Sequence, residues 1–162
     1  MKRNINKPLI AAAILCVLAV VVMLLSLTLG HRQVRQPFTP PPFDPEARAG
    51  TPAVPEALGW TALDAQVFRV SVCGVIVPTE DRADVWLTNP PENRVWLKLR
   101  LFDQAGNLLG ETGLIRPGEY VQSVTLRTVP AGGTGVVLKI MAYEPETYHS
   151  AGAVSLNTVI SE

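Results

Sequence analysis

The stretch RVWLKLRLF, residues 94–102, decides the fold class, because its side chains alternate between polar and apolar. One face of such an extended segment carries Val95, Leu97, Leu99 and Leu101, and the other carries Arg94, Trp96, Lys98 and Arg100. A period of two is typical of a β-strand that is buried on one side only. The stretch therefore predicts a half-buried strand with one face in a core.

Comparable patterns recur from Val67 to the end of the chain. We expect further strands at 67–77, 83–88, 108–114, 120–127, 136–143 and 153–160. Turn chemistry separates them, most clearly at Asn89–Asn93 with its two prolines, at Asp103–Asn107 with Gly106, and at the Pro117-Gly118 pair of a type II turn. About seven strands in this spacing predict an all-β fold, an antiparallel immunoglobulin-like β-sandwich, with a small β-barrel as the alternative.

The turn at Asn89–Asn93 also predicts a specific side-chain contact. A hairpin folded about Pro91 would place Trp86 opposite Trp96 on neighbouring strands. Directly opposite aromatic side chains stabilise antiparallel pairs. We therefore expect a cross-strand pair of tryptophans.

The N-terminal part of the chain has a different character. Residues 9–30 carry no charge and are rich in Ala, Val, Leu and Ile, and a helix of this length crosses a hydrocarbon core about 30 Å thick. The run is longer than the hydrophobic region of a signal peptide and lacks a clear cleavage site, so we expect an uncleaved transmembrane helix in contact with lipid rather than a signal peptide. Cys16, in the middle of the run, fits a small apolar side chain.

The flanking charges predict the orientation of this helix. Lys2, Arg3 and Lys7 precede the run, whereas Arg32 and Arg35 follow it. The positive-inside rule then places residues 1–8 in the cytoplasm and the C-terminal domain outside the cell membrane. We expect a Pro-rich stalk at 31–59, because seven of the fourteen prolines lie between Gln36 and Pro55, followed by one short helical turn within 55–64 and the extracytoplasmic β-sandwich domain at 60–162.

Charge and cysteine content limit the possible functions. Residues 37–162 contain nine Lys or Arg and fourteen Asp or Glu, a net charge of −5, which argues against a nucleic-acid partner. Cys73 lies in a strand-like segment, and Cys16 lies in the apolar run, so the two are not expected to pair. We expect a buried Cys73 thiol, with an intermolecular disulfide as the alternative.

No catalytic or cofactor motif is present in the sequence. There is no P-loop, dinucleotide fingerprint or nucleophile motif, so we expect no enzyme activity, no catalytic residue and no cofactor. The acidic clusters Glu80, Asp81, Asp84 and Glu144, Glu146, His149 lack the ligand spacing of known metal sites. We interpret both as hydrated turns and expect no metal ligand.

Aromatic side chains provide the candidate partner-binding residues. Trp96 falls on the polar face of its strand, and Tyr143 and Tyr148 lie at or beyond the end of another. Exposed aromatic side chains are enriched at partner surfaces, although they also cover sheet edges. We therefore take Trp96, Tyr143 and Tyr148 as the candidate site.

The region from Val85 to Ile160 resembles small single-pass surface proteins of Gram-positive bacteria that are often linked to mobile or conjugative elements. The features that carry the resemblance are Asn89-Pro-Pro-Glu-Asn93, the Pro117-Gly118 turn, a glycine-led strand ending at Tyr143 and a last strand that contains Asn157. The resemblance implies an anchored, non-enzymatic immunoglobulin-like ectodomain.

Together these patterns predict a membrane-anchored module that binds an unknown protein or the cell envelope, as part of a surface, secretion or conjugation assembly. A carbohydrate-binding or enzyme-accessory module is the second hypothesis. A hydrolase is the third, because a fold does not by itself define a function.

Overall fold

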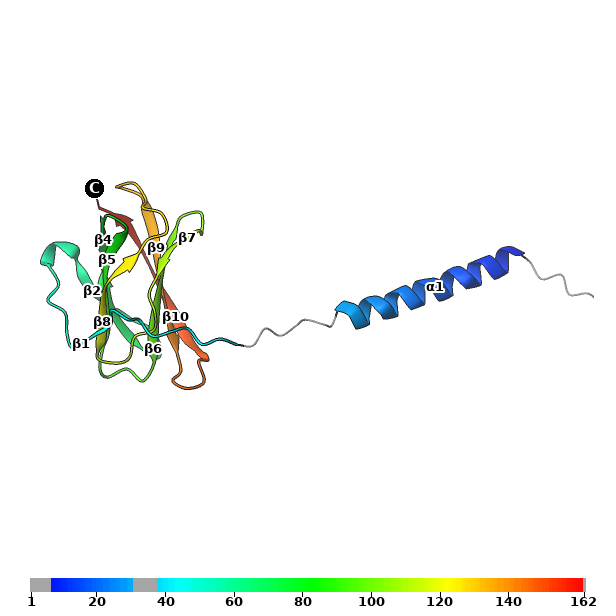
Figure 1. Ribbon diagram of the computed structural model, residues 1–162, viewed down its shortest axis with the longest axis horizontal. Coiled ribbons are helices and arrows are strands. Elements are labelled where there is room, and N and C mark those ends of the chain that lie inside the picture. Colours follow the sequence, from blue (N-terminus) through cyan, green and yellow to red (C-terminus); the bar gives the residue numbers. More distant parts are fainter. Residues whose placement is uncertain (1–6, 31–37, 162) are drawn as a thin grey trace, which may run out of the picture. The chain divides into compact units, whose positions relative to one another are not determined.

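The computed structural model describes residues 7–30 and 38–161, and it contains one α-helix and a β-rich domain (Figure 1). The chain divides into two units, Met1–Thr39 and Pro40–Glu162. The helices are α1 Lys7–Gly30 and the 3-10 turn η1 Glu56–Leu58. The strands are β1 Arg48–Ala49, β2 Trp60–Asp64, β3 Arg69–Cys73, β4 Val75–Thr79, β5 Arg82–Asn89, β6 Trp96–Asp103, β7 Leu108–Glu111, β8 Glu119–Thr125, β9 Gly135–Tyr143 and β10 Ser150–Ile160.

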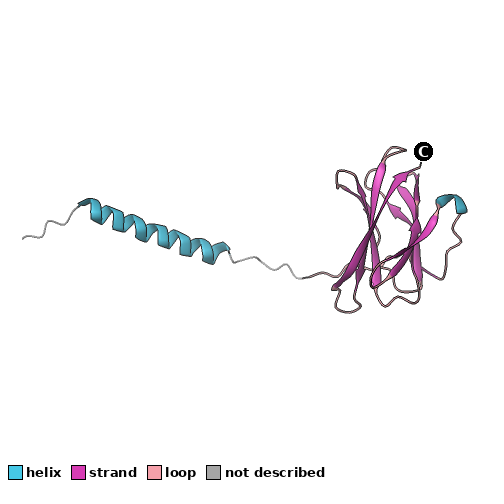
Figure 2. Cartoon of the chain, turned by 180° about the vertical axis from the view of Figure 1, so that it is seen from behind, coloured by secondary structure: helices cyan, strands magenta, loops and turns pink. Residues whose placement is uncertain are grey.

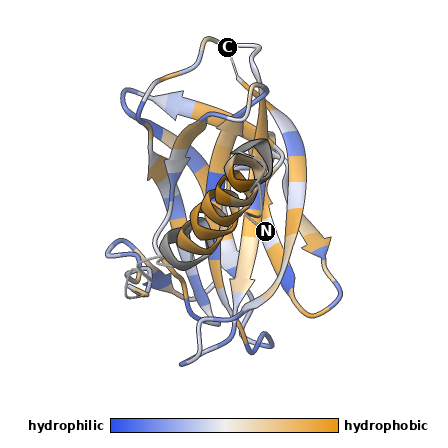
Figure 3. Cartoon of the chain, turned by 90° about the vertical axis from the view of Figure 1, so that its right-hand side faces the viewer, coloured by the Kyte–Doolittle hydropathy of each residue, from blue (hydrophilic) through white to orange (hydrophobic). Residues whose placement is uncertain are grey.

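Helix α1 exposes apolar side chains around its whole circumference. The consecutive residues Val22, Met23, Leu24 and Leu25 are each more than half exposed, and successive helical residues point about 100° apart, so together they face every side of the helix. Figure 3 shows hydrophobic colouring along the helix. Within the described residues, no helix combines the length and the apolarity needed to cross a bilayer. The membrane-spanning role of residues 9–30 stays a prediction.

The ten strands form one curled sheet in the order β1-β8-β5-β4-β10-β9-β6-β7, with β2 and β3 attached beside β5. We call β1, β2, β3, β4, β5 and β8 the β5 half, and β6, β7, β9 and β10 the β9 half. Figure 1 shows these halves on either side of the domain, and Figure 2 shows them from behind. The prediction of a mostly β fold with one N-terminal helix is confirmed.

Strand β4 connects the two halves. It pairs antiparallel with β5 through Val77, and it pairs parallel with β10, where Val75 and Ile76 lie opposite Val159 and Ile160. At the other side of the sheet, Gly110 and Leu126 form a single bridge between the end of β7 and the residue after β8. The sheet therefore curls around one core, and the expectation of purely antiparallel pairing is wrong at β4.

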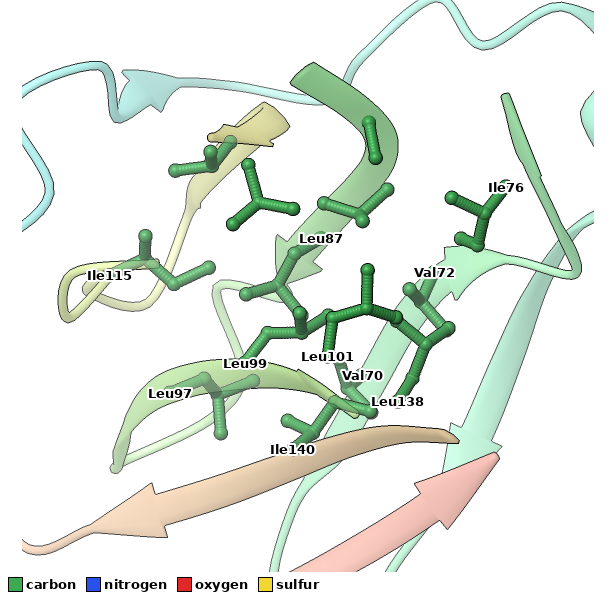
Figure 4. Packing of buried hydrophobic residues seen from close by; sticks show 14 of the residues in the cluster. Val70, Val72, Ile76, Leu87, Leu97, Leu99, Leu101, Ile115, Leu138 and Ile140 are labelled. Atoms are coloured by element: carbon green, nitrogen blue, oxygen red, sulfur yellow. The ribbon is translucent and has the colours of Figure 1, made fainter. Parts of the chain in front are cut away.

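The core lies between the two halves (Figure 4). Val95, Leu97, Leu99 and Leu101 are all buried, which confirms the inner face predicted from residues 94–102. Figure 4 shows that β6 and β9 contribute Leu97, Leu99, Leu101, Leu138 and Ile140 to the same cluster as Val70, Val72, Ile76, Leu87 and Ile115. The alternation of residues 94–102 in the sequence therefore predicts correctly which apolar side chains of β6 are buried.

Two predicted turns are also confirmed. Gly118 has φ +79°, and the Glu119 N–H donates to the Arg116 carbonyl at 3.1 Å, as a type II turn requires. The Asp103–Asn107 loop connects β6 to β7, with hydrogen bonds from Asn107 to the Asp103 carboxylate.

The predicted Trp86–Trp96 pair is wrong. Strand β5 pairs with β3, β4 and β8, whereas β6 pairs with β7 and β9, so the Asn89–Asn93 turn leads from one half of the sheet to the other. Buried Asn89 holds this crossing in place, because its amide donates to the carbonyls of Val95 and Ile115 at 2.9 and 3.1 Å.

Strand boundaries differ from expectation in the first part of the domain. The segment 67–77 is divided at Gly74 into β3 and β4, and Pro78 lies within β4 rather than ending it. Only η1 is helical within 55–64, and Trp60–Asp64 forms a strand that was not predicted. Strand β7 ends at Glu111, short of Leu114. The division at Gly74, the strand β2 and the short strand β1 within the expected stalk together give ten strands where about seven were expected.

The β-rich unit begins at Pro40 rather than at residue 60. We call residues 40–50 the N-terminal strap. Its backbone binds the domain at several points: Leu114 N–H donates to Pro42, Asp44 N–H donates to Leu114, and β1 pairs with β8. Gly113 permits the close approach, because a Cβ there would lie 2.4 Å from the Asp44 nitrogen. Proline content alone did not distinguish this segment from a stalk.

Replacing Leu99 with Ala tests the core. Leu99 is fully buried, so Leu99→Ala should lower the free energy of unfolding by about 2–5 kcal/mol in urea titrations. Val129→Ala is the control, because Val129 is half exposed and should change stability little. Equal effects of the two substitutions would contradict the burial of this face.

Candidate functional site

Two of the three candidate residues lie in one aromatic cluster on the outer face of the β9 half. The ring of Trp96, at the start of β6, contacts Phe43 of the strap at a centroid distance of 4.8 Å and Tyr148 at 5.2 Å, both edge to face. The Arg116 guanidinium lies 3.6 Å from the centre of the Phe43 ring. Such contacts each stabilise by about 0.5–1.5 kcal/mol beyond burial.

Tyr143 adjoins this cluster. It lies directly opposite Trp96 in the β6–β9 register, and its hydroxyl donates to the Met141 sulfur at 3.7 Å. Tyr148 is positioned by the tight loop after β9, where its N–H donates to the Glu144 carbonyl at 3.0 Å. All three residues are only partly exposed.

The cluster attaches the strap to the domain. Phe43 lies between Trp96 and Arg116, so one ring and one cation both contact the strap. The sequence analysis did not place Phe43 or Arg116 in the site, because Phe43 fell within the expected stalk and its contact with Arg116 joins segments far apart in the sequence. Asp44, next to Phe43, accepts a hydrogen bond from Gly113 N–H at 2.7 Å, which is another long-range contact of the strap.

A second feature, which the sequence analysis did not predict, is a pocket of about 280 Å³ beside Trp60. Its walls come from separate parts of the β5 half, including the strap, β2, β3 and the end of β5. The lining residues are Gly50, Thr51, Trp60, Ser71, Thr88, Asn89, Pro90, Pro91 and Gly118. None of these side chains ionises near neutral pH, so the pocket suits an uncharged ligand group.

The polar groups of this pocket are mostly engaged within the protein. Asn89 accepts from Asn93 at 2.6 Å and donates to two carbonyls, so both N–H groups of its side chain are engaged. Thr88 donates to the Trp86 carbonyl at 3.2 Å. A ligand would therefore meet an indole, proline rings and hydroxyl groups rather than a dense set of hydrogen-bond donors.

Trp86 is a strained residue next to this pocket region. Its φ is +46°, at the bulge where the β5–β8 register shifts between Asp84 and Leu87. Its carbonyl accepts from the Trp60 indole N–H at 3.2 Å, and its ring stacks on Tyr120 at 6.2 Å. Within the described residues, the buried Trp86 Nε1 has no hydrogen-bond partner. The bulge thus helps to position the Trp60 ring at the pocket wall.

A charged group on the outer face of the β9 half is buried more deeply than the sequence indicated. Lys98 Nζ and Arg100 Nε lie 3.1 and 2.9 Å from Glu111, and the Lys98 side chain is only 9% exposed. Burial by itself raises the pKa of Glu111, but hydrogen bonds and charges from Lys98 and Arg100 outweigh this effect and hold the pKa below its ordinary value. The pair stabilises the strand contact between β6 and β7.

The strap carries a second ion pair. The Arg82 guanidinium binds Glu46 through two hydrogen bonds, one of them 3.0 Å from Nη1. The hydrogen bond from Arg82 lowers the pKa of Glu46. Because this pair is exposed, it contributes little to stability but favours one position of the strap.

The expected burial of Cys73 is confirmed, whereas the interpretation of Asp84 as part of a hydrated turn is wrong, because Asp84 lies half-buried in β5. Cys73 is buried, and burial, with a contribution from Asp84, raises the pKa of its thiol to about 12. Glu80 and Asp81 lie in the exposed turn after β4, and Glu144 and His149 form a 4.0 Å contact in the loop after β9. In the part of the chain that the structure describes, no three His, Cys, Asp or Glu residues are grouped as metal ligands.

The ion pair at Glu111 predicts a pH-dependent stability. The pKa of Glu111 is lower in the folded protein than in the unfolded chain. The ionised carboxylate therefore stabilises the fold at any pH above the pKa of the unfolded chain, and this stability is lost as the pH falls through the folded pKa. Glu111→Gln should cost roughly 1–3 kcal/mol at pH 7, and the difference from wild type should shrink in acid, as urea titrations at both pH values will show.

Glu92→Gln, at an exposed turn position, is the control for this substitution. A loss that stays constant with pH after Glu111→Gln would contradict the ionic role of Glu111.

Comparison with known proteins reveals no close relative. No family model matches the chain, and no curated protein matches it. Among the solved structures that match is the crystal structure of CopC from Methylosinus trichosporium OB3b, with 14% sequence identity and a TM-score of 0.37. The match covers 63% of this chain and 93% of that chain.

Proposed function

We propose that this chain is a non-enzymatic, membrane-anchored binding module, with a C-terminal domain that binds an uncharged group of a partner protein or of the cell envelope. The observation that carries the proposal is the pocket beside Trp60. The partner would belong to a surface, secretion or conjugation assembly.

The chemistry of the pocket favours binding over catalysis. General acid–base and nucleophilic catalysis require a titratable or nucleophilic group in contact with the substrate. The three hydroxyl-bearing lining residues, Thr51, Ser71 and Thr88, have no His, Asp, Glu or Lys among their fellow lining residues to activate them. Apolar walls with a few polar groups are typical of recognition sites.

The proposed location depends on the sequence of the N-terminal unit. Residues 9–30 form an uncharged run, and the exposed apolar surface of α1 on every side favours an apolar environment. The basic residues Lys2, Arg3 and Lys7 support a cytoplasmic N-terminus. In this arrangement the uncharged run ends at residue 30, the strap begins at residue 40, and the acidic domain lies outside the cell.

We further propose that the domain is an immunoglobulin-like sandwich. Its support is the crossing from β5 to β6 between the two halves, and the two sets of antiparallel strands that enclose a single core. Strand β4 pairs with β5 and with β10 and so connects the two halves along one side of the sandwich.

A carbohydrate-binding role is the second candidate, and Trp60 favours it. Trp60 lines the pocket, is 37% exposed, and lies beside hydroxyl groups of Thr51 and Ser71. An exposed indole next to hydroxyl groups suits the apolar face of a sugar ring. The two alternatives differ in the class of ligand, protein or glycan, whose binding requires Trp60.

Replacing Trp60 with Ala tests the proposed site. The full chain in detergent micelles is immobilised and incubated with envelope extract, and separately with a glycan array. Trp60→Ala should reduce the retained protein by roughly tenfold, as expected for loss of an aromatic anchor in a pocket. Loss of glycan binding instead would favour the carbohydrate alternative.

Val129→Ala is the control, since Val129 is 48% exposed and lines neither this pocket nor the hollow beside residues 151–154. Retention that is unchanged by Trp60→Ala, or no retained protein or glycan with the wild-type chain, would overturn the proposed function.

A further inference from the structure

Strand β10 is paired along the whole of one edge but only at the end of the other. It pairs with β9 from Ser150 to Val159, whereas on its other edge it pairs with β4 only at Val159 and Ile160. Figure 1 shows that β10 ends beside β4 near the C-terminus and begins at the opposite end of the domain. In the described part of the chain, the second edge of residues 150–158 therefore has no neighbouring strand.

The hydrogen bonds identify which backbone groups lie on this edge. Ser161 N–H donates to the Ile76 carbonyl on the β4 side at 2.8 Å. Backbone groups of a strand alternate in direction, so the N–H and C=O groups of Ala153, Ser155 and Asn157 also face the open edge. Their side chains are exposed on the outer face, while those of Val154 and Leu156 point towards the core.

The edge lacks the features that normally prevent strand addition. Natural edge strands are protected by charged side chains, prolines, or covering elements. The sequence of β10, SAGAVSLNTVI, contains neither a charge nor a proline. Only the register shift between Ser150 and Gly152 interrupts it, at one end.

The core is open along the same edge. Six partly buried apolar residues pack against the core, and four of them lie here: Ala65 of the β2–β3 turn and Ala151, Val154 and Leu156 of β10. A hollow of about 400 Å³ separates the β2–β3 turn, residues 64–68, from residues 151–154 of β10. Asp64, the charged residue that lines it, is ion-paired with Arg69 at 2.6 Å. We call this hollow and the adjoining β10 edge the β10 seam.

We propose that the β10 seam binds an extended segment of a partner protein, which adds as a strand beside β10. Its main chain would pair with Ala153, Ser155 and Asn157, and its alternate apolar side chains would cover Ala65, Val154 and Leu156. This inference rests on the proposed function in assuming a protein partner, but it uses residues that are distinct from the Trp60 pocket. Strand addition to an exposed edge is a recurrent mode of peptide recognition.

The shape of the seam favours a single segment over the edge of a second folded copy. The β2–β3 turn flanks one end, where Gly152 approaches Phe68, and the Thr158 hydroxyl binds the Gly74 carbonyl at the other. One added strand occupies about 4.8 Å beside its neighbour. An edge strand of a folded copy would bring its own sheet against the β2–β3 turn.

A proline at Ser155 tests the seam selectively. It removes an N–H that faces the open edge and leaves the β9 pairing intact, and proline is tolerated in edge strands at such positions. Peptides of about nine residues are selected from a random phage-displayed library on the full chain in detergent micelles, and their affinities for wild type, Ser155→Pro and Ser155→Ala are measured by fluorescence anisotropy.

Selected peptides should carry apolar residues at alternate positions. Their affinity should fall roughly tenfold with Ser155→Pro and change by less than about twofold with Ser155→Ala, because only the first removes a main-chain donor. Circular dichroism checks that Ser155→Pro folds. If it does not, Ala65→Lys serves instead and should weaken the same peptides, because Ala65 lines the hollow and the substitution places a charge in the seam.

Three results would overturn the proposal: peptides without alternating apolar residues, peptides that bind both variants as tightly as wild type, or no selected peptide. A wild-type dimer in analytical ultracentrifugation that Ser155→Pro dissociates would replace the partner segment by a second copy. Loss of peptide binding with Ser155→Pro but not with Trp60→Ala separates the seam from the pocket.

Discussion

Strand β4 pairs with both halves of the sheet, and this double pairing controls how the domain closes. Gly74 separates it from β3, and Val75 and Ile76 then lie beside the last two residues of β10. The same strand continues antiparallel to β5. Because β4 reaches only the end of β10, the two halves are joined at one end of this side and separated at the other. The core is therefore complete near the C-terminus and open beside residues 150–158.

The N-terminal strap covers another part of the domain. It pairs with β8, binds Leu114 and Gly113 through backbone groups, and places Phe43 between Trp96 and Arg116. The aromatic cluster expected to bind a partner thus has a structural task, which makes the pocket beside Trp60 the stronger candidate site. Through these contacts the strap is attached to the domain from Pro42 onward.

Sequence alone predicted the parts of the fold that depend on local periodicity. The inner face of β6, the Pro117-Gly118 turn and the buried Cys73 all follow from alternation, turn chemistry and β-branched neighbours. The pairing of β5 with β8 did not follow, because Asn89 forms a crossing between halves through long-range hydrogen bonds that no local pattern reveals. The strap was missed for the same reason. The Trp60 pocket is lined by segments that are far apart in the sequence, from Gly50 to Gly118. The β10 seam exists because no strand pairs with one edge of residues 150–158 of β10 in the described part of the chain. Neither feature therefore has a sequence signature.

Hydrogen exchange of single backbone amides, followed by NMR on the full chain in micelles, tests the central claim most directly. With the edge of β10 open, Ala153, Ser155 and Asn157 should exchange fast, while Val154, Leu156 and Thr158, whose N–H groups face β9, should be protected. This alternation is the predicted result. Uniform protection from residue 153 to residue 158 would show that the second edge of β10 is paired and would contradict the account.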